Sequence, residues 1–173
     1  MDSRLLAALE AIDSIAGPLA PEVIGRPRDG RWSIGEILEH LTLAFTANAE
    51  AIEKTVASGQ RRVRRPSWKQ TLGRIMVLDV GYFPKVQAPE MTVPTGGVDP
   101  AVSLVAIRAG LARVDEALSR AAASFGENVA VVNHPYLAGL SVTHWRKLHW
   151  RHTIHHMRQV RAIASDVLSR PAR

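Results

Sequence analysis

Residues 32–41 read WSIGEILEHL, and this stretch marks the beginning of a long helix. Ser33 and Glu36 have the spacing of a capping box, in which each side chain accepts a hydrogen bond from the backbone N–H of the other residue. Trp32, just before the cap, is placed to pack against Ile37 across the helix end. Apolar residues then recur at steps of three and four, which predicts an amphipathic helix as far as about Ser58.

Three other long helices are predicted from the same kinds of signal. Their approximate ranges are 3–16, 100–126 and 141–167, and a shorter helix is expected over 68–83. Segments 21–31, 86–100 and 133–140 contain closely spaced Pro and Gly and are expected to be irregular. Valines between 129 and 132 favour a short strand, but no other stretch offers a partner run.

The helix over 100–126 is expected to bury one stripe, made of Val102, Val105, Ala106, Ala109, Val114 and Leu118.

Four long helices joined by loops of moderate length predict an all-α fold, namely a four-helix bundle with one shorter additional helix. The chain has 173 residues, the size of one ordinary domain, so residues 1–173 are expected to form a single unit with one core. Hydrophobic residues make up 46% and charged residues 22%, which excludes a disordered chain. No internal repeat is present.

The composition restricts the chemistry of any site. The chain has seven His and no Cys. Without cysteine it forms no disulfides, zinc ribbons or iron–sulfur clusters, and it has no cysteine nucleophile. A soft metal must therefore be held by imidazole, and any thiol must arrive as a separate molecule.

The chain has 22 Lys and Arg against 16 Asp and Glu, a net charge of +6. Four arginines gather in Arg61–Arg65, which we interpret as a solvated loop; the alternative is a site for an anionic partner such as a phosphate, an acidic substrate or a nucleic acid.

The N-terminal residues lack the pattern of a signal peptide, and no stretch suits a membrane span. We therefore expect a cytoplasmic protein with neither a membrane nor a nucleic acid as partner.

The last predicted helix contains HWRHTIHHMRQ at residues 149–159. At about 100° per residue, His152 and His156 lie about 40° apart on the helix surface and one turn from each other. Trp145 and Ile163 fall on the same side, so this face is expected to be buried. Two histidines at i and i+4 can direct their ring nitrogens to one ion at about 2.0 to 2.1 Å.

His40 is the strongest candidate for a third ligand. It lies inside the helix over 33–58, at the edge of the apolar stripe and beside small residues, including Ala44 and Ala47. Three imidazoles from two helices would leave coordination positions open for water or substrate, as in a reactive metal site. The predicted metal ligands are therefore His40, His152 and His156.

Other readings of the histidines stay open. A buried histidine is more often a hydrogen-bonded core residue than a ligand, and this alternative applies to all three candidates. His149 is either core or a fourth ligand, and His155 either supports the pair or lies in an interface. Gln159 could hydrogen-bond a ligand ring or bound water. His134 and His144 are expected to act in a turn and at a helix start.

Two segments of the chain resemble the DinB-like superfamily. Residues 32–41 resemble its early helix, in which a tryptophan and a helix cap precede a His-Leu pair, while residues 134–141, Trp145 and 152–160 resemble its closing motif. The two motifs occur in the correct order, more than 90 residues apart. The resemblance implies a DinB/YfiT-like four-helix bundle, often a homodimer, with a divalent metal on His40, His152 and His156.

Characterised members of that superfamily include transferases that add bacillithiol, mycothiol or glutathione to electrophiles. The resemblance therefore implies a metal-dependent transferase that joins a low-molecular-weight thiol cosubstrate to a small-molecule electrophile. Zinc or nickel is the expected metal, with manganese or iron as alternatives. Two other functions stay open: a metal-dependent hydrolase that uses bound water, and a non-catalytic helical binding module.

Overall fold

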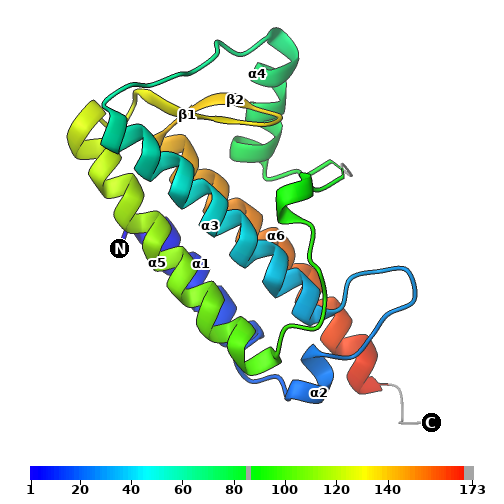
Figure 1. The fold of residues 1–173 in the computed structure, drawn as a ribbon. Helices are drawn as coiled ribbons and strands as arrows, with labels where there is room; N and C mark the ends of the chain where they lie inside the picture. The colour runs from blue at the N-terminus through cyan, green and yellow to red at the C-terminus, as the bar shows by residue number, and fades with distance from the viewer. Residues whose placement is uncertain (85–86, 170–173) are drawn as a thin grey trace.

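The computed structural model describes residues 1–84 and 87–169, and this part of the chain is mostly helical (Figure 1). The prediction of a mainly helical fold is confirmed. The four longest helices lie side by side, with α3 packed mainly on α5 and α1 mainly on α6 (Figure 1). They are α1 (Ser3–Ile15), α3 (Ile34–Ser58), α5 (Pro100–Phe125) and α6 (Val142–Ser169).

Shorter elements connect these helices. They are α2 (Pro21–Ile24), α4 (Trp68–Arg74), the π-helix η1 (Ile75–Val80) and the 3-10 helix η2 (Glu90–Thr92). The prediction of an irregular segment over 21–31 is wrong at α2, because Pro21 occupies the first helical position, where its missing N–H costs nothing. In the predicted connection over 86–100, residue 86 lies outside the described residues, and η2 interrupts the rest.

A small hairpin corrects the expectation that residues 133–140 form a loop. Strand β1 (Ala130–His134) pairs antiparallel with β2 (Ala138–Ser141), with Val132 opposite Leu140. The second strand has no β-branched residue, so its sequence gives no strand signal. Its position depends on Arg74, whose side chain donates hydrogen bonds to the carbonyls of Leu137 and Gly139. The hairpin and α4 therefore lie together at one end of the long helices (Figure 1).

The core runs between the long helices and includes Trp145 and Phe45, both with no exposed surface. Here the predicted stripe of α5 is partly wrong. Val114 and Leu118 are buried as expected, whereas Val102 and Val105 are 56% and 66% exposed. The helix instead turns Ile107, Gly110 and Leu111 inward. Alanines and valines surround much of this helix, so its periodicity alone does not select one buried face.

The segment before α4 and the apolar face of α4 both lie at the surface. The four arginines of Arg61–Arg65 are exposed. The side chain of Asn133 in β1 holds this segment by two hydrogen bonds, one accepted from the backbone N–H of Arg64 and one donated to the carbonyl of Arg62. Within α4 and η1, the apolar side chains of Trp68, Leu72 and Ile75 are exposed. None of the helices among the described residues combines the length and apolar character that a membrane crossing requires.

Candidate metal centre

The candidate site lies between α3 and α6, and local sequence signals position both helices. The capping box of Ser33 and Glu36 starts α3, with Glu36 N 3.1 Å from Ser33 Oγ and Ser33 N 2.7 Å from a Glu36 carboxylate oxygen. This start places His40 in the second turn of α3. On α6, His152 and His156 are separated by one turn, so their side chains share a face.

The structure brings the three predicted ligands together. The Nε2 atoms of His40 and His152 are 3.4 Å apart, and those of His156 and His152 are 3.0 Å apart. One ligand atom from each ring lies within 4.8 Å of the others. His40 and His156 are buried, whereas His152 is partly accessible. The site is therefore a compact cluster with one partly open side.

Hydrogen bonds fix the orientation of two of the rings. His40 Nδ1 lies 2.7 Å from the carbonyl oxygen of Thr92, and His156 Nδ1 lies 2.8 Å from Oε1 of Gln159. Because both oxygens only accept, each Nδ1 must carry the proton, and each Nε2 presents a lone pair toward the cluster. A histidine that binds a metal through one ring nitrogen usually donates a hydrogen bond from the other nitrogen to a neighbouring oxygen, as both rings do here.

The imidazoles are neutral at pH 7. Burial lowers the pKa of His40, although the Thr92 carbonyl partly opposes this. Burial and the neighbouring histidines hold the pKa of His152 well below its usual range. Burial, together with the charge that His40 would carry, lowers the pKa of His156 to about 3. Neutral imidazole is the form that binds metals, so the cluster does not have to lose protons first.

The spacing and chemistry of the three rings fit a divalent ion. Ligand nitrogens at about 2.0 to 2.1 Å from one ion lie about 2.9 to 3.4 Å from each other in octahedral or tetrahedral geometry, as the two measured spacings do. Lone pairs of His40 and His156 both face His152, whose Nε2 can donate a proton to only one of them. A cation between the rings would satisfy all three nitrogens at once.

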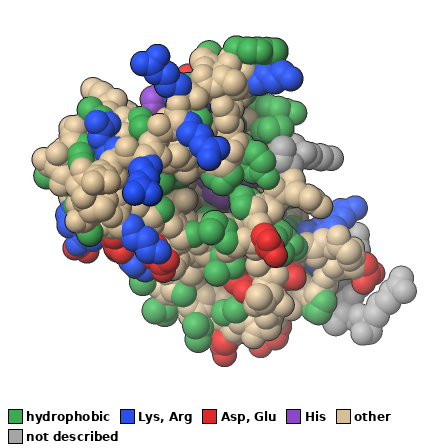
Figure 2. Space-filling view, turned by 45° about the horizontal axis from the view of Figure 1, so that its top comes forward, with side chains coloured by type: hydrophobic (Ala, Val, Ile, Leu, Met, Phe, Trp, Pro, Cys, Tyr) green, Lys and Arg blue, Asp and Glu red, His purple; other side chains and the backbone are tan. Residues whose placement is uncertain are grey.

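Two aromatic side chains flank the cluster. The Trp32 and His40 rings have centroids 5.0 Å apart. Phe83 stacks on His152, with ring centroids 5.6 Å apart, and its centroid lies 4.9 Å from that of His155. In the space-filling view, histidine atoms are visible in a hollow between hydrophobic side chains (Figure 2). Apolar rings therefore lie against two of the three candidate ligands.

The other histidines of α6 have separate roles. His149 is 1% exposed and packs between Phe45 and Trp145, away from the three ligand atoms, which supports the core interpretation. His155 accepts a hydrogen bond from Nε2 of Gln159, at 3.1 Å. The expectation that Gln159 hydrogen-bonds a candidate ligand ring is confirmed, and His155 extends this chain of bonds.

The two remaining histidines act in local structure, as expected. Nδ1 of His134 accepts from the backbone N–H of Tyr136 in the hairpin turn, and His144 bonds with the hydroxyl of Ser141 at the start of α6.

Sequence reasoning missed the contribution of the segment around η2. The Thr92 carbonyl is a backbone group, so no residue type signals its role. Glu39 holds the same segment against α3 by accepting hydrogen bonds from Thr95 and Gly96. Partial burial raises the pKa of the Glu39 carboxyl, but these hydrogen bonds lower it, and the net effect is a pKa below the usual value. Phe83 was likewise not predicted to contact the site.

The fold and the site together define a mainly helical protein with a candidate three-histidine metal centre. A family described as "Protein of unknown function (DUF1569)" matches residues 3–162, and the chain belongs to that family. The matched range includes all three histidines of the cluster. Neither a comparison with curated proteins nor one with solved structures found a match.

Proposed function

We propose that this protein is a DinB-like, metal-dependent transferase that joins a low-molecular-weight thiol to an electrophilic small molecule. The observation that carries the proposal is the convergence of Nε2 from His40, His152 and His156, with two of the rings anchored through Nδ1. The side-by-side arrangement of α1, α3, α5 and α6 supports the finer proposal of a DinB/YfiT-like four-helix bundle (Figure 1).

A bound divalent ion would lower the pKa of a thiol or water molecule in contact with it, which supplies a nucleophile near neutral pH. The protein's own residues hold three neutral imidazoles in fixed orientations through Thr92 and Gln159. Trp32 and Phe83 place apolar rings against His40 and His152. In the reaction, the thiol sulfur bonds to the electrophilic carbon, the leaving group departs with its electron pair, and the thiol proton goes to solvent.

One feature, the lack of an Asp or Glu in the cluster among the described residues, favours a thiol over water as the nucleophile. Because the chain has no cysteine, that thiol would come from a separate molecule. Hydrolytic histidine sites on helices use a neighbouring carboxylate as general base. Within the described ranges, no Asp or Glu joins the three histidines. A thiol needs such a base less, because its pKa is already close to neutral.

The metal content of the purified protein tests the first part of this proposal. We expect about one zinc or nickel ion per chain by mass spectrometry of the metals, with manganese or iron as alternatives. The variant His152→Ala should lose the ion, while the matched variant His155→Ala, on the same helix, should retain it. A folded wild-type protein that never retains any of these metals after stripping and refilling would exclude the proposal.

Turnover tests the second part. The metal-loaded protein should consume 1-chloro-2,4-dinitrobenzene only when a thiol such as glutathione, bacillithiol or mycothiol is present. Hydrolysis of esters or amides without thiol would instead select the hydrolase. The proposal also includes a homodimer, which light scattering should detect as twice the mass of one chain.

A further inference from the structure

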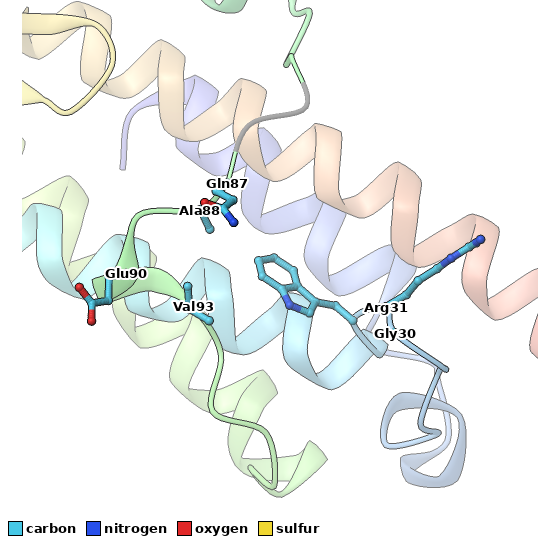
Figure 3. Close-up of a pocket in the computed structure, with 7 residues that line it drawn as sticks. Gly30, Arg31, Gln87, Ala88, Glu90 and Val93 are labelled. Atoms are coloured by element: carbon cyan, nitrogen blue, oxygen red, sulfur yellow. The ribbon is translucent and has the colours of Figure 1, made fainter.

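A pocket of about 680 Å³ lies beside the histidine cluster. Trp32 forms one wall, and the segment leading to and following η2 forms the other through Gln87, Ala88 and Val93 (Figure 3). The lining also includes Arg31 and Glu90. The pocket therefore lies between the residues that precede α3 and the segment that contacts His40.

Two contacts connect this pocket with the cluster. The Trp32 ring that lines the pocket lies 5.0 Å from the His40 ring. Thr92, between the lining residues Glu90 and Val93, accepts the hydrogen bond from His40 Nδ1. A molecule in the pocket would thus contact the same side chain and segment that orient one of the candidate ligands.

The lining indicates what kind of molecule fits. The indole of Trp32 offers a flat apolar face, and Ala88 and Val93 add small apolar surfaces. Arg31 and Glu90 both belong to the lining and have opposite charges, and in Figure 3 their charged groups extend in opposite directions. Gln87 supplies a side-chain amide there, and Tyr136 holds its backbone through a 2.9 Å hydrogen bond. Because the one positive and the one negative side chain of the lining balance, and the indole of Trp32 is flat, the lining favours an uncharged, flat group over a charged one.

We propose that this pocket binds the planar, uncharged part of the substrate that reacts at the histidine cluster, with Trp32 as the stacking surface. The inference rests on the proposed function for its link to a reaction at the cluster. The choice of ligand class rests only on the pocket lining. Trp32 is thus a positioning residue for substrate.

Fluorine NMR of protein labelled with 5-fluorotryptophan tests the ligand class. The chain has four Trp, and the Trp32 signal is identified by its loss in Trp32→Phe. The probe is 4-nitroanisole, and the charged control is 4-nitrobenzoate. We expect a saturable shift of the Trp32 signal with 4-nitroanisole and at least tenfold weaker binding of 4-nitrobenzoate. Trp68, which is 73% exposed on α4, provides the internal control and should shift little.

The pocket assignment is overturned if Trp32 shows no saturable shift, if Trp68 shifts as much, or if both probes bind equally. A second variant, Ala88→Phe, fills the pocket from a loop position. It should weaken 4-nitroanisole binding at least tenfold while zinc affinity, measured with a chromophoric chelator, stays within twofold. Unchanged binding of the probe to this variant would also overturn the assignment.

Paramagnetic Co²⁺ tests the link between pocket and cluster. Ring protons of bound 4-nitroanisole should relax faster with Co²⁺-loaded than with Zn²⁺-loaded protein, because the pocket adjoins His40. Equal relaxation would place the probe away from the cluster and contradict the link. Binding of 4-nitroanisole without binding of any metal would contradict the proposed function but not the ligand class. Binding of a metal without binding of 4-nitroanisole would contradict the pocket assignment but not the proposed function.

Discussion

Oε1 of Gln159 lies 2.8 Å from Nδ1 of His156 and accepts its hydrogen bond, while Nε2 of the same amide donates to His155 at 3.1 Å. A single exposed side chain thus connects a candidate metal ligand with a histidine outside the cluster. Because the amide oxygen holds the proton on Nδ1, the Nε2 lone pair of His156 faces His152.

Replacement of Gln159 should weaken metal binding without affecting the fold. Gln159→Leu removes the acceptor for His156 Nδ1, and the zinc dissociation constant should rise about 10- to 100-fold. Gln159→Glu keeps an acceptor oxygen and should retain affinity close to that of the wild type. Competition with a chromophoric chelator measures both, and equal affinities for the Leu variant and the wild type would contradict the orienting role.

Zinc should stabilise the native protein. At a free concentration about 100 times its dissociation constant, a ligand that binds only the native state adds about 2.7 kcal/mol to the free energy of unfolding. For a chain of this length, the melting temperature should rise by roughly 5 to 10 °C. EDTA should reverse the rise, and His40→Ala should abolish it. A melting temperature that does not respond to zinc would argue against a preformed site.

Acid should destabilise the metal-free protein partly through His149. Burial, with a smaller effect of His134, lowers its pKa to about 3. Between its unfolded pKa of about 6.5 and this value, only the unfolded state binds the proton, so stability falls as the pH falls. His149→Leu should reduce the slope near pH 5 by about 1.4 kcal/mol per pH unit.

Urea denaturation in EDTA at several pH values between 4.5 and 7 measures this slope. At pH 7 the variant should be as stable as the wild type or more so, because His149 Nε2 is buried without a hydrogen-bond partner in the described part of the chain. An unchanged pH slope in the variant would show that His149 is not buried in its neutral form.

The contact between α3 and α5 should depend on a small residue at Gly110. A Cβ atom at this position would lie 3.3 Å from Cβ of Phe45, which has no exposed surface. Gly110→Leu should therefore lower the free energy of unfolding by about 1 to 3 kcal/mol or more. Ala109→Leu, the neighbouring exposed position, should change it by about 0.5 kcal/mol or less. Equal stability of the two variants in urea would contradict this packing.

Much of the helical structure could be predicted because its signals are local. The capping box of Ser33 and Glu36 and the cap at Asp99 begin α3 and α5 at the expected positions. Local signals failed where a neighbouring element decided the outcome. Strand β2 exists because β1 and Arg74 supply partners for its backbone, and α5 turns Gly110 inward because Phe45 packs there.

The sequence alone determined that His152 and His156 share one face, because a separation of four residues on a helix fixes their relative direction. It also determined that no thiolate of this chain can be a metal ligand and that any thiol must be external, because the chain has no cysteine. Only the tertiary structure decided that His40, 112 positions from His152, meets this pair. It also decided that the Thr92 carbonyl and Phe83 border the cluster, since no side-chain pattern encodes contacts made by a backbone carbonyl or across separate elements.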